Sequence, residues 1–412
     1  MTTGRVTAEI AERLAEICGV ANVLYDDVEK LEPYSHDEVA DAHYHHMPDV
    51  VVKPRSTDEV ARIMALANAE LIPVTPRGAG SGLSGGAVAV RGGIVMSFER
   101  MNRILEIDPA NMMVVVEPGV VTNEINEAVK EYGLFYAGYP MSVETCYIGG
   151  NVAENAGGGK AIKYGVTGRY VYGLEAVLPT GDVLQLGGKR MKDVTGYDLV
   201  HLLVGSEGTL AVVTQVTLKL LPLPRAAADL LVLFADVESA IGMVPRIMTE
   251  SGITPTAVEF LDRLSAQTAC RYLNEHFAYA AAGAMLLITI DGTDRKQVEA
   301  DYETVGELCL ANGAIEVYVA DNATTSERVW RIRRNIAEAF KVYSPVQSLE
   351  DIVVPFADIP KIIPELERLA EKYGVVIPCY GHAGDGNLHV TIVKGLDTDM
   401  ATWEASLGPL LT

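Results

Sequence analysis

The sequence predicts an α+β protein built from two successive modules. Short apolar runs of strand character and most of the 38 glycines occupy the first half of the 412-residue chain. In the second half, strand-like runs alternate with segments of helical periodicity. The texture changes around Leu221-Pro222-Leu223-Pro224, so we place the junction there. The expected boundaries are 1–46 for an N-terminal helical segment, 47–225 for the first module and 226–412 for the second.

The N-terminal segment is expected to be helical because apolar residues recur at helical spacing among scattered glutamates. The first module then opens with a short strand at Val50–Lys53. Ser56-Thr57-Asp58-Glu59 has the pattern of a capping box and predicts the start of a helix. Further strands are expected at Gly93–Phe98, Met113–Glu117, Glu175–Leu178 and Val183–Leu186, the last two joined by a hairpin turn.

In the second module, two βαβ-type halves are expected to form one sheet covered by helices. The strands are predicted at Leu230–Phe234, Ala257–Leu261, Ala284–Ile290 and Ala314–Val319, with helices beginning near residues 237, 262 and 295. The final region predicts a helix at Ile359–Tyr373 that Gly374 ends. The segment 375–393 then reads as a strand, a polar loop and a second strand.

Composition excludes several classes of protein. The formal net charge of −22 argues against a nucleic-acid binder, which needs a clustered positive surface. No stretch reaches the roughly 18 uncharged apolar residues of a transmembrane segment, and the N-terminus lacks the apolar centre of a signal peptide. A cytoplasmic location is expected, with peripheral attachment to a membrane left open. Five widely spaced cysteines without a C-x-x-C pair indicate reduced thiols rather than an iron–sulfur cluster in this chain.

The first glycine cluster is Pro76-Arg77-Gly78-Ala79-Gly80-Ser81-Gly82-Leu83-Ser84-Gly85-Gly86. A nicotinamide-type dinucleotide site would need a helix after such a turn, but the segment that follows, AVAVRGGIVMSF, is strand-like. The loop therefore lies between strands and is expected to offer backbone N–H groups to an anion, with charge added by Arg77. The alternative is a mobile surface loop.

Two further clusters follow, at Cys146–Gly159 and Val204–Leu210. Small residues in the first of them would let a flat ring system lie against the backbone, although tight packing between elements would explain them equally well. The second, by itself, is a tight turn before a strand.

Together, the three clusters resemble the FAD-binding domain of the vanillyl-alcohol oxidase and p-cresol methylhydroxylase (PCMH) type. Nearly the whole chain resembles the FAD-linked D-lactate dehydrogenase and glycolate oxidase flavoprotein family. The resemblance implies a PCMH-type FAD-binding domain of two α+β subdomains, followed by a ferredoxin-like α+β substrate or cap domain. It implies that the FAD pyrophosphate lies on Arg77, Gly78, Ala79, Gly80, Ser81, Gly82 and Leu83.

The same resemblance implies flavin contacts from Pro140, Ser142, Gly149, Gly150, Asn155, Gly157, Glu207, Gly208 and Leu210. Relatives that bond flavin covalently through the first loop carry a histidine where Ser81 stands in this sequence. Non-covalent FAD is therefore expected.

The segment Gly381-His382-Ala383-Gly384-Asp385-Gly386-Asn387-Leu388-His389 carries two histidines on a strand, loop, strand unit. Neutral imidazoles are common metal ligands, but packed histidines beside turn residues are an equal alternative. The resemblance implies that His382 and His389 bind zinc, iron or manganese. It also implies a third, carboxylate ligand from a later G-E-H-G segment, and this chain stops at Thr412 without one. The second module is therefore expected to be truncated at its C-terminus.

Several guanidinium groups follow one another on the predicted helix at Trp330-Arg331-Ile332-Arg333-Arg334. A basic helix turn is usually a solvated face, but the resemblance implies that Arg333 binds a substrate carboxylate. Glu350-Asp351 is a candidate acidic pair near the site. His43, His45 and His46 are expected to lie in an exposed segment rather than a metal site.

The resemblance implies FAD-dependent oxidation of a small D-2-hydroxy acid, D-lactate or glycolate, to the 2-oxo acid. Hydride would pass to flavin N5, with Arg333 on the carboxylate and a metal on His382 and His389 polarising the 2-hydroxyl. Electrons would go to an electron-transferring flavoprotein, an iron–sulfur subunit, a cytochrome or a quinone. The alternatives are an FAD-holding subunit or fragment that is incomplete without a partner or its missing segment, and an NAD-linked dehydrogenase, which the strand after the glycine loop disfavours.

Overall fold

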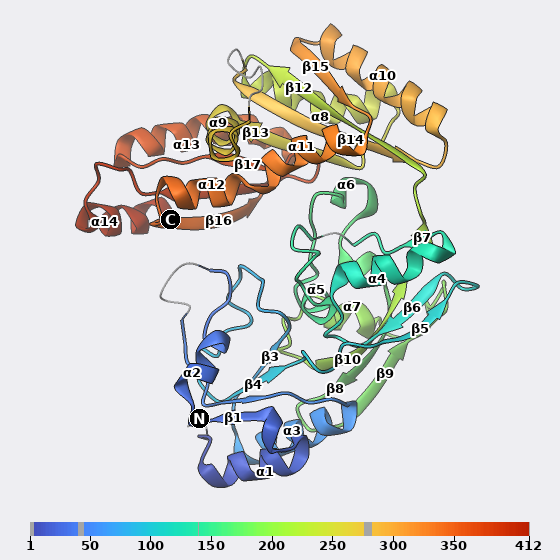
Figure 1. The fold of residues 1–412 in the computed structure, drawn as a ribbon, viewed down its shortest axis with the longest axis vertical. Helices are drawn as coiled ribbons and strands as arrows, with labels where there is room; N and C mark the ends of the chain where they lie inside the picture. The colour runs from blue at the N-terminus through green and yellow to red at the C-terminus, as the bar shows by residue number, and fades with distance from the viewer. Residues whose placement is uncertain (1–3, 40–44, 139, 276–281, 412) are drawn as a thin grey trace. The chain divides into compact units, whose positions relative to one another are not determined.

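A computed structural model describes residues 4–39, 45–138, 140–275 and 282–411 of the chain (Figure 1). The chain divides into two compact units. Unit 1 holds the residues up to Gly158 and from Gly165 to Leu223, and unit 2 holds Gly159–Tyr164 and the chain from Pro224 on. The short excursion at Gly159–Tyr164 was not anticipated from the sequence.

The first sheet of unit 1 has four strands and carries the glycine loop. Its order is β1 (Val23–Tyr25), β2 (Val50–Val52), β4 (Ile94–Ser97) and β3 (Val74–Arg77), in which β2, β4 and β3 run parallel. The helices α1 (Ala8–Cys18) and α3 (Thr57–Glu70) pack their apolar faces on this sheet. The N-terminal segment thus supplies a helix and a strand to unit 1.

The start of α3 confirms the predicted cap with one difference. The Ser56 side chain accepts a hydrogen bond from the backbone N of Glu59 at 3.3 Å, as a capping box requires. In a capping box the Glu59 carboxylate would accept a hydrogen bond from the backbone N–H of Ser56. Here it accepts one from the backbone N–H of the preceding residue, Arg55, at 2.9 Å.

The second sheet of unit 1 is antiparallel, with the order β5 (Ile104–Asp108), β6 (Met113–Val116), β10 (Val212–Lys219), β8 (Val171–Val177) and β9 (Val183–Gly187). The predicted hairpin of β8 and β9 is confirmed, whereas β5 was not anticipated. The strand predicted directly after the glycine loop is wrong at 87–90. Those residues form turns, in which Val88 N donates to Gly85 O and Gly92 N to Ala89 O, and the strand begins only at Ile94.

Unit 2 is built on one antiparallel sheet of seven strands. Their order is β15 (Ala314–Ala320), β12 (Ala226–Phe234), β14 (Ala284–Gly292), β13 (Ala257–Asp262), β17 (Cys379–His382), β18 (Asn387–Val393) and β16 (Gln347–Val353). With α8 (Val237–Ser251) and α10 (Arg295–Ala311), the first four strands in sequence make the predicted ferredoxin-like β-α-β-β-α-β unit. The helix α9 (Arg263–Leu273) is inserted between its second and third strands.

The two faces of this sheet differ in chemistry. One face is an apolar core beneath α8, α10 and α13 (Ile359–Tyr373), in which Phe234 and Phe260 are fully buried. The opposite face packs on α9, α11 (Ala323–Arg334) and α12 (Ile336–Tyr343). Because side chains alternate along a strand, this second face also receives the buried polar residues Asp229, Glu259 and Thr289 of β12, β13 and β14.

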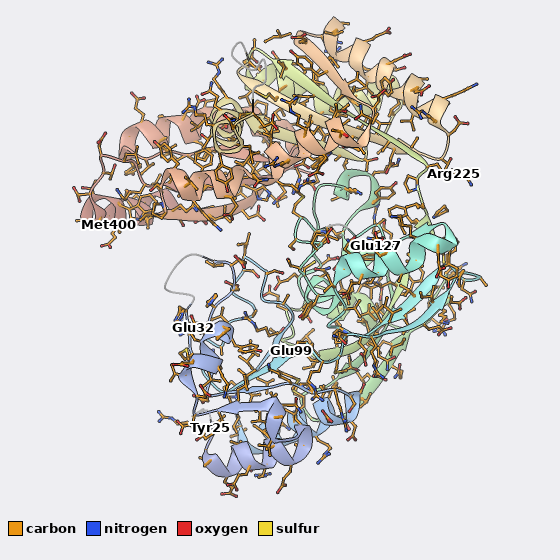
Figure 2. The ribbon with its side chains drawn as sticks, in the orientation of Figure 1. Tyr25, Glu32, Glu99, Glu127, Arg225 and Met400 are labelled. Atoms are coloured by element: carbon orange, nitrogen blue, oxygen red, sulfur yellow. The ribbon has the colours of Figure 1, made fainter. Side chains whose placement is uncertain are left out.

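The entry of the chain into unit 2 is fixed by one more ladder bond. Arg225, labelled in Figure 2, donates a hydrogen bond from its backbone N–H to Gly292 O at 2.8 Å, directly beside the pairing of β12 with β14.

In the described part of the chain, we find no helix that combines the length and the apolar character needed to cross a bilayer.

The helix α11 is fastened to the sheet by one carboxylate. The buried Asp229 on β12 accepts hydrogen bonds from Thr289 on β14, and from Ser326 and Trp330 on α11, the last at 3.1 Å. Ser326 and Trp330 are one helical turn apart, so both face the sheet. Arg333 follows on the same side of the helix.

Replacing Asp229 with Ala should destabilise unit 2 by about 1–3 kcal/mol, because the indole N–H of Trp330 then loses its acceptor. Both tryptophans of the chain, Trp330 and Trp403, lie in unit 2, so tryptophan fluorescence during urea unfolding reports this unit. The control Asp321→Ala removes an exposed carboxylate and should leave the transition in place. An unchanged midpoint for Asp229→Ala would show that this carboxylate does not hold the helix.

Replacing Gly381 with Ala should destabilise the hairpin of β17 and β18 by about 1–3 kcal/mol. A Cβ there would lie 2.3 Å from Asn387 O and 2.8 Å from Leu388 Cα, and both are backbone atoms of the paired strand. In the control Gly242→Ala, the new Cβ on α8 meets nothing within 4 Å. That helical substitution should leave stability unchanged or raise it by up to about 1 kcal/mol. Equal unfolding midpoints for the two variants would contradict the close approach.

Candidate active site and cofactor cradle

The register of unit 2 collects charged side chains on the sheet face that α11 covers. Glu259 on β13 pairs with His382 on β17, and Tyr380 on β17 pairs with His389 on β18. Asp351 on β16 is in turn the partner of His389. Side chains that are directly opposite in neighbouring strands share one face, so these five residues form a row across three strand pairs.

Glu259 joins two of the predicted site residues. Its side chain is fully buried, and its Oε1 lies 2.6 Å from Nδ1 of His382. Its Oε2 accepts a hydrogen bond from Nε of Arg333 at 2.7 Å. The structure thus brings Arg333 and His382 together on one carboxylate, although they come from elements far apart in the sequence.

The second histidine stands beside the first. The ring centroids of His382 and His389 are 5.3 Å apart and nearly perpendicular. Nδ1 of His389 lies 3.1 Å from Oδ1 of Asp351, and the same oxygen accepts from Nδ2 of Asn387 at 2.9 Å. Each histidine therefore has a carboxylate at Nδ1, an arrangement that leaves Nε2 for a ligand.

Arg333 is buried, with 4% of its surface exposed, and it is only partly satisfied. Its guanidinium carbon lies 5.1 Å from the centre of the Tyr380 ring. Its Nη2 is a buried donor without a hydrogen-bond partner among the described residues. Buried guanidinium donors are seldom left unpaired, so this end of the fork is suited to an anionic ligand.

Burial and charge both act on this cluster. Burial raises the pKa of Glu259, but the neighbouring His382 and Arg333 outweigh it and hold the pKa below its usual value. Burial lowers the pKa of His389, against the opposing influence of Asp351. The result is an ionised Glu259 and a neutral His389 at pH 7, the forms in which a carboxylate accepts hydrogen bonds and an imidazole binds a metal.

The histidines supply two donors for a metal ion but not a full set. Among the residues that the structure describes, no group of three histidine, cysteine, aspartate or glutamate side chains is arranged to hold an ion. The early histidines belong to unit 1 and not to this cluster: His45 lies 3.0 Å from Ser35 Oγ, and His43 lies outside the described residues.

In unit 1 the structure brings the three glycine clusters together. A Cβ on Gly78 would lie 3.5 Å from Gly150 N, which shows how closely the first and second clusters pack. Glu207 N donates to Ala153 O at 2.9 Å and so joins the third cluster to the second. Gly208 packs on Pro76, and its φ of +70° favours glycine at that turn.

The first loop presents free backbone donors. Within the described part of the chain, no backbone N–H group from Gly78 to Leu83 has a hydrogen-bond partner. A Cβ added at Gly82 or at Gly150 would meet nothing within 4 Å, so both positions border open space. Free N–H groups beside a surface without side chains are what a bound phosphate requires.

Arg77 has a different position from the one expected of a phosphate ligand. Its guanidinium is buried and donates to Pro33 O at 3.3 Å and to Ala87 O at 3.2 Å, close to the Tyr34 ring. A Cβ on Gly80 would lie 2.1 Å from Nη2 of Arg77. In this structure the Arg77 guanidinium packs against the loop and is held by backbone carbonyls, and the absence of a side chain at Gly80 leaves space for it. Glu99, labelled in Figure 2, accepts a hydrogen bond from the Tyr34 hydroxyl at 2.9 Å.

The remaining predicted contacts lie in or beside these clusters. Pro140 and Ser142 form a turn in which Val143 N donates to Pro140 O. Gly149 donates to Pro118 O at 2.8 Å, and Asn155 accepts from Gly168 N at 2.8 Å. The remaining predicted residues that are exposed at the surface are Ala79, Leu83, Gly157 and Leu210.

Sequence reasoning missed Glu259, although a signal was present. Glu259 is the one charged residue in the apolar strand Ala257–Leu261, and a charge at such a position needs a buried partner. Asp351 lies in the acidic pair that the sequence singled out, whereas Glu350 points elsewhere and accepts from Ser348 at 2.6 Å.

Family models match the two units in order. The FAD binding domain model matches residues 48–187, and the model of the C-terminal domain of FAD linked oxidases matches residues 223–408.

Curated relatives match over nearly the whole chain. The glycolate oxidase subunit GlcD of Bacillus subtilis (strain 168) is 40% identical over 386 residues, which cover 94% of this chain and 81% of that protein. The D-lactate dehydrogenase of Anaerostipes hadrus is 36% identical over 391 residues, with the same shares covered.

Solved structures confirm the fold. A p-cresol methylhydroxylase with substrate bound has a TM-score of 0.79 at 19% identity, covering 99% of this chain and 88% of that chain. An alkyldihydroxyacetonephosphate synthase has a TM-score of 0.77 at 20% identity, covering 98% and 84%. The chain therefore belongs to the family of FAD-linked oxidoreductases that includes glycolate oxidase subunit GlcD and D-lactate dehydrogenase.

Proposed function

We propose that this chain oxidises a small D-2-hydroxy acid, D-lactate or glycolate, to the 2-oxo acid. The observation that carries the proposal is the buried, unpaired Nη2 of Arg333, held beside the histidine pair through Glu259. Relatives named D-lactate dehydrogenase and glycolate oxidase subunit support the choice of substrate.

Arg333 would bind the substrate carboxylate. Its Nε is committed to Glu259, so the outer end of the guanidinium is the end that a carboxylate would meet. A charge-assisted pair in a buried position is strong and directional. Because Tyr380 and Glu259 hold the guanidinium, the substrate would be oriented by a group that is itself fixed.

His382 and His389 would lie at the hydroxyl-bearing carbon. They fit two ligand positions of a divalent metal, zinc, iron or manganese, since both offer Nε2 and have a carboxylate at Nδ1. Such an ion, when bound, would supply Lewis acidity that lowers the pKa of the 2-hydroxyl.

Unit 1 would hold FAD without a covalent bond, since Ser81 offers no ring nitrogen. The N–H groups from Gly78 to Leu83 would bind the pyrophosphate, and Arg77 would support the loop through its hydrogen bond to Ala87 O. The flavin would lie against the second and third clusters, at Pro140, Ser142, Gly149, Gly150, Asn155, Gly157, Glu207, Gly208 and Leu210. FAD, when bound, supplies the hydride acceptor.

The reduced flavoprotein would need a partner to take its electrons. An electron-transferring flavoprotein, an iron–sulfur subunit, a cytochrome or a quinone would serve, and the word subunit in the name of the Bacillus subtilis relative supports a protein partner. We propose a cytoplasmic location, with peripheral attachment to a membrane as the alternative.

A second candidate function is an FAD-holding subunit that is catalytically incomplete without a partner. The observation that favours it is the two-ligand histidine pair, for which the described residues supply no third ligand. This candidate predicts bound flavin that substrate does not reduce.

An anaerobic visible spectrum of the purified chain with added D-lactate, glycolate or L-lactate separates the two candidates. We expect the flavin bands to bleach with D-lactate or glycolate and to persist with L-lactate, because one stereoisomer presents its C2 hydrogen correctly when its carboxylate is fixed. Persistent bands with all three acids would favour the incomplete subunit or another substrate.

Replacing Gly82 with Leu should weaken FAD binding by about tenfold or more, since filling the cradle costs at least about 1–3 kcal/mol. A Cβ at Gly82 meets no atom of the fold within 4 Å, so the unfolding transition should not move. Gly80 is a poorer test, because a side chain there displaces Arg77. FAD absorbance per protein is the measurement, with Gly242→Leu on α8 as the control. Full FAD content in Gly82→Leu would overturn the cradle assignment.

A further inference from the structure

Glu259 is a fully buried carboxylate to which neither the family comparisons nor the sequence assign a role. Resting on the function proposed above, we propose that Glu259 is a positioning residue that fixes the tautomer of His382 and the orientation of Arg333. One side chain would then orient both the metal-binding His382 and the carboxylate-binding Arg333.

The tautomer follows from what each partner can donate. An ionised carboxylate only accepts hydrogen bonds, so Nδ1 of His382, 2.6 Å from Oε1, must carry the proton. Nε2 is then the ring nitrogen that is left to bind a ligand. A carboxylate at Nδ1 is the usual support for a metal-binding histidine, and its loss typically weakens metal binding by 10- to 100-fold.

The position of Glu259 also separates this role from that of a metal ligand. Nδ1 and Nε2 point to different sides of the imidazole ring, and Glu259 is at Nδ1. An ion held by Nε2 would have Glu259 beyond the ring rather than in its coordination sphere.

The other oxygen of Glu259 cannot exchange its role. Oε2 accepts from Nε of Arg333, which is always a donor. If Glu259 is replaced by Gln, the amide oxygen must therefore face Arg333, and the amide N–H₂ must face His382. The variant would force Nδ1 of His382 to accept and would place the proton on Nε2, where it blocks metal binding.

The same substitution acts on Arg333 in the opposite sense. Removing the negative charge beside Arg333 leaves the positive charge of the guanidinium uncompensated. An added carboxylate should therefore bind more tightly. A variant that merely disordered the site would weaken both metal and carboxylate binding. Weaker metal binding together with tighter carboxylate binding would come only from a Glu259→Gln amide held in the orientation described above. The test therefore separates a positioning role from general disorder.

Asp351 provides a matched control. It also places a carboxylate at Nδ1 of a site histidine, but its single oxygen Oδ1 faces both His389 and Asn387. In Asp351→Asn the amide oxygen can serve both donors, so the His389 tautomer is kept. This variant removes one negative charge from the cluster, as Glu259→Gln does, but it leaves the proton on the same ring nitrogen of the histidine.

The experiment uses the FAD-loaded chain after removal of metal by a chelator. Isothermal titration with Mn²⁺ should give an affinity at least about tenfold weaker for Glu259→Gln than for the parent chain, and a clearly smaller loss for Asp351→Asn, in which the tautomer is kept. Titration of the metal-free protein with oxamate should give binding about twofold or more tighter in Glu259→Gln. With D-lactate and Mn²⁺, kcat should fall while KM does not rise.

A direct readout is the ¹⁵N spectrum of histidine-labelled protein, in which the His382 proton should move from Nδ1 to Nε2 in Glu259→Gln. FAD content should be unchanged, since Glu259 belongs to unit 2 and the cradle to unit 1. Unchanged Mn²⁺ affinity together with an unchanged tautomer would overturn the proposal. So would parallel loss of Mn²⁺ and oxamate binding in a folded Glu259→Gln variant.

Failure of the proposed substrate has a different signature. If no 2-hydroxy acid reduces the parent flavin while Glu259→Gln still inverts the tautomer and loses Mn²⁺, the positioning role stands and the substrate assignment fails. If D-lactate reduces both proteins equally with equal Mn²⁺ affinity, the substrate assignment stands and the role of Glu259 fails.

Discussion

A charge buried in the centre of a sheet restricts everything that packs around it. Glu259 has no exposed surface, and an unpaired carboxylate there would cost several kcal/mol. Its two oxygens are satisfied by Arg333 from a helix and His382 from a neighbouring strand. Both partners must reach the same point, so the position of α11 above the sheet and the register of β17 are linked. Breaking either contact would leave the other ion without its partner.

The alternation of side chains in the sheet explains how this charged row coexists with a large apolar core. Phe260 points into the core beneath α8 and α13, while its neighbour Glu259 points to the opposite face. A slip of one residue in β13 would place the carboxylate in the apolar core and a phenylalanine among the histidines. The apolar core therefore specifies the register, and the register assembles the site. Gly381 takes part because only a residue without a side chain permits the close pairing of β17 with β18.

The elements that the sequence predicted correctly are those with a strong local signal. Ser56 caps α3, Gly374 ends α13, and the apolar strands of unit 2 are bounded by turns. The prediction failed where local pattern and tertiary contact disagree. Residues 87–90 alternate like a strand but form turns. The phosphate contact of Arg77 stays a prediction, and in this structure its guanidinium donates to backbone carbonyls. The partners of Glu259 lie 74 and 123 residues further along the chain, so no window of sequence could pair them.

Under the function proposed above, the two units would recognise ligands by different physical means. The loop of unit 1 offers backbone N–H groups, which bind any phosphate that fits and carry little information about the rest of a ligand. The cluster of unit 2 offers side chains whose positions depend on one another through Glu259. A substitution in the loop would therefore change how much cofactor is held, whereas one in the cluster would change which acid and which ion are held. Because the two effects are measured separately, cofactor content serves as an internal check on every experiment directed at the charged row.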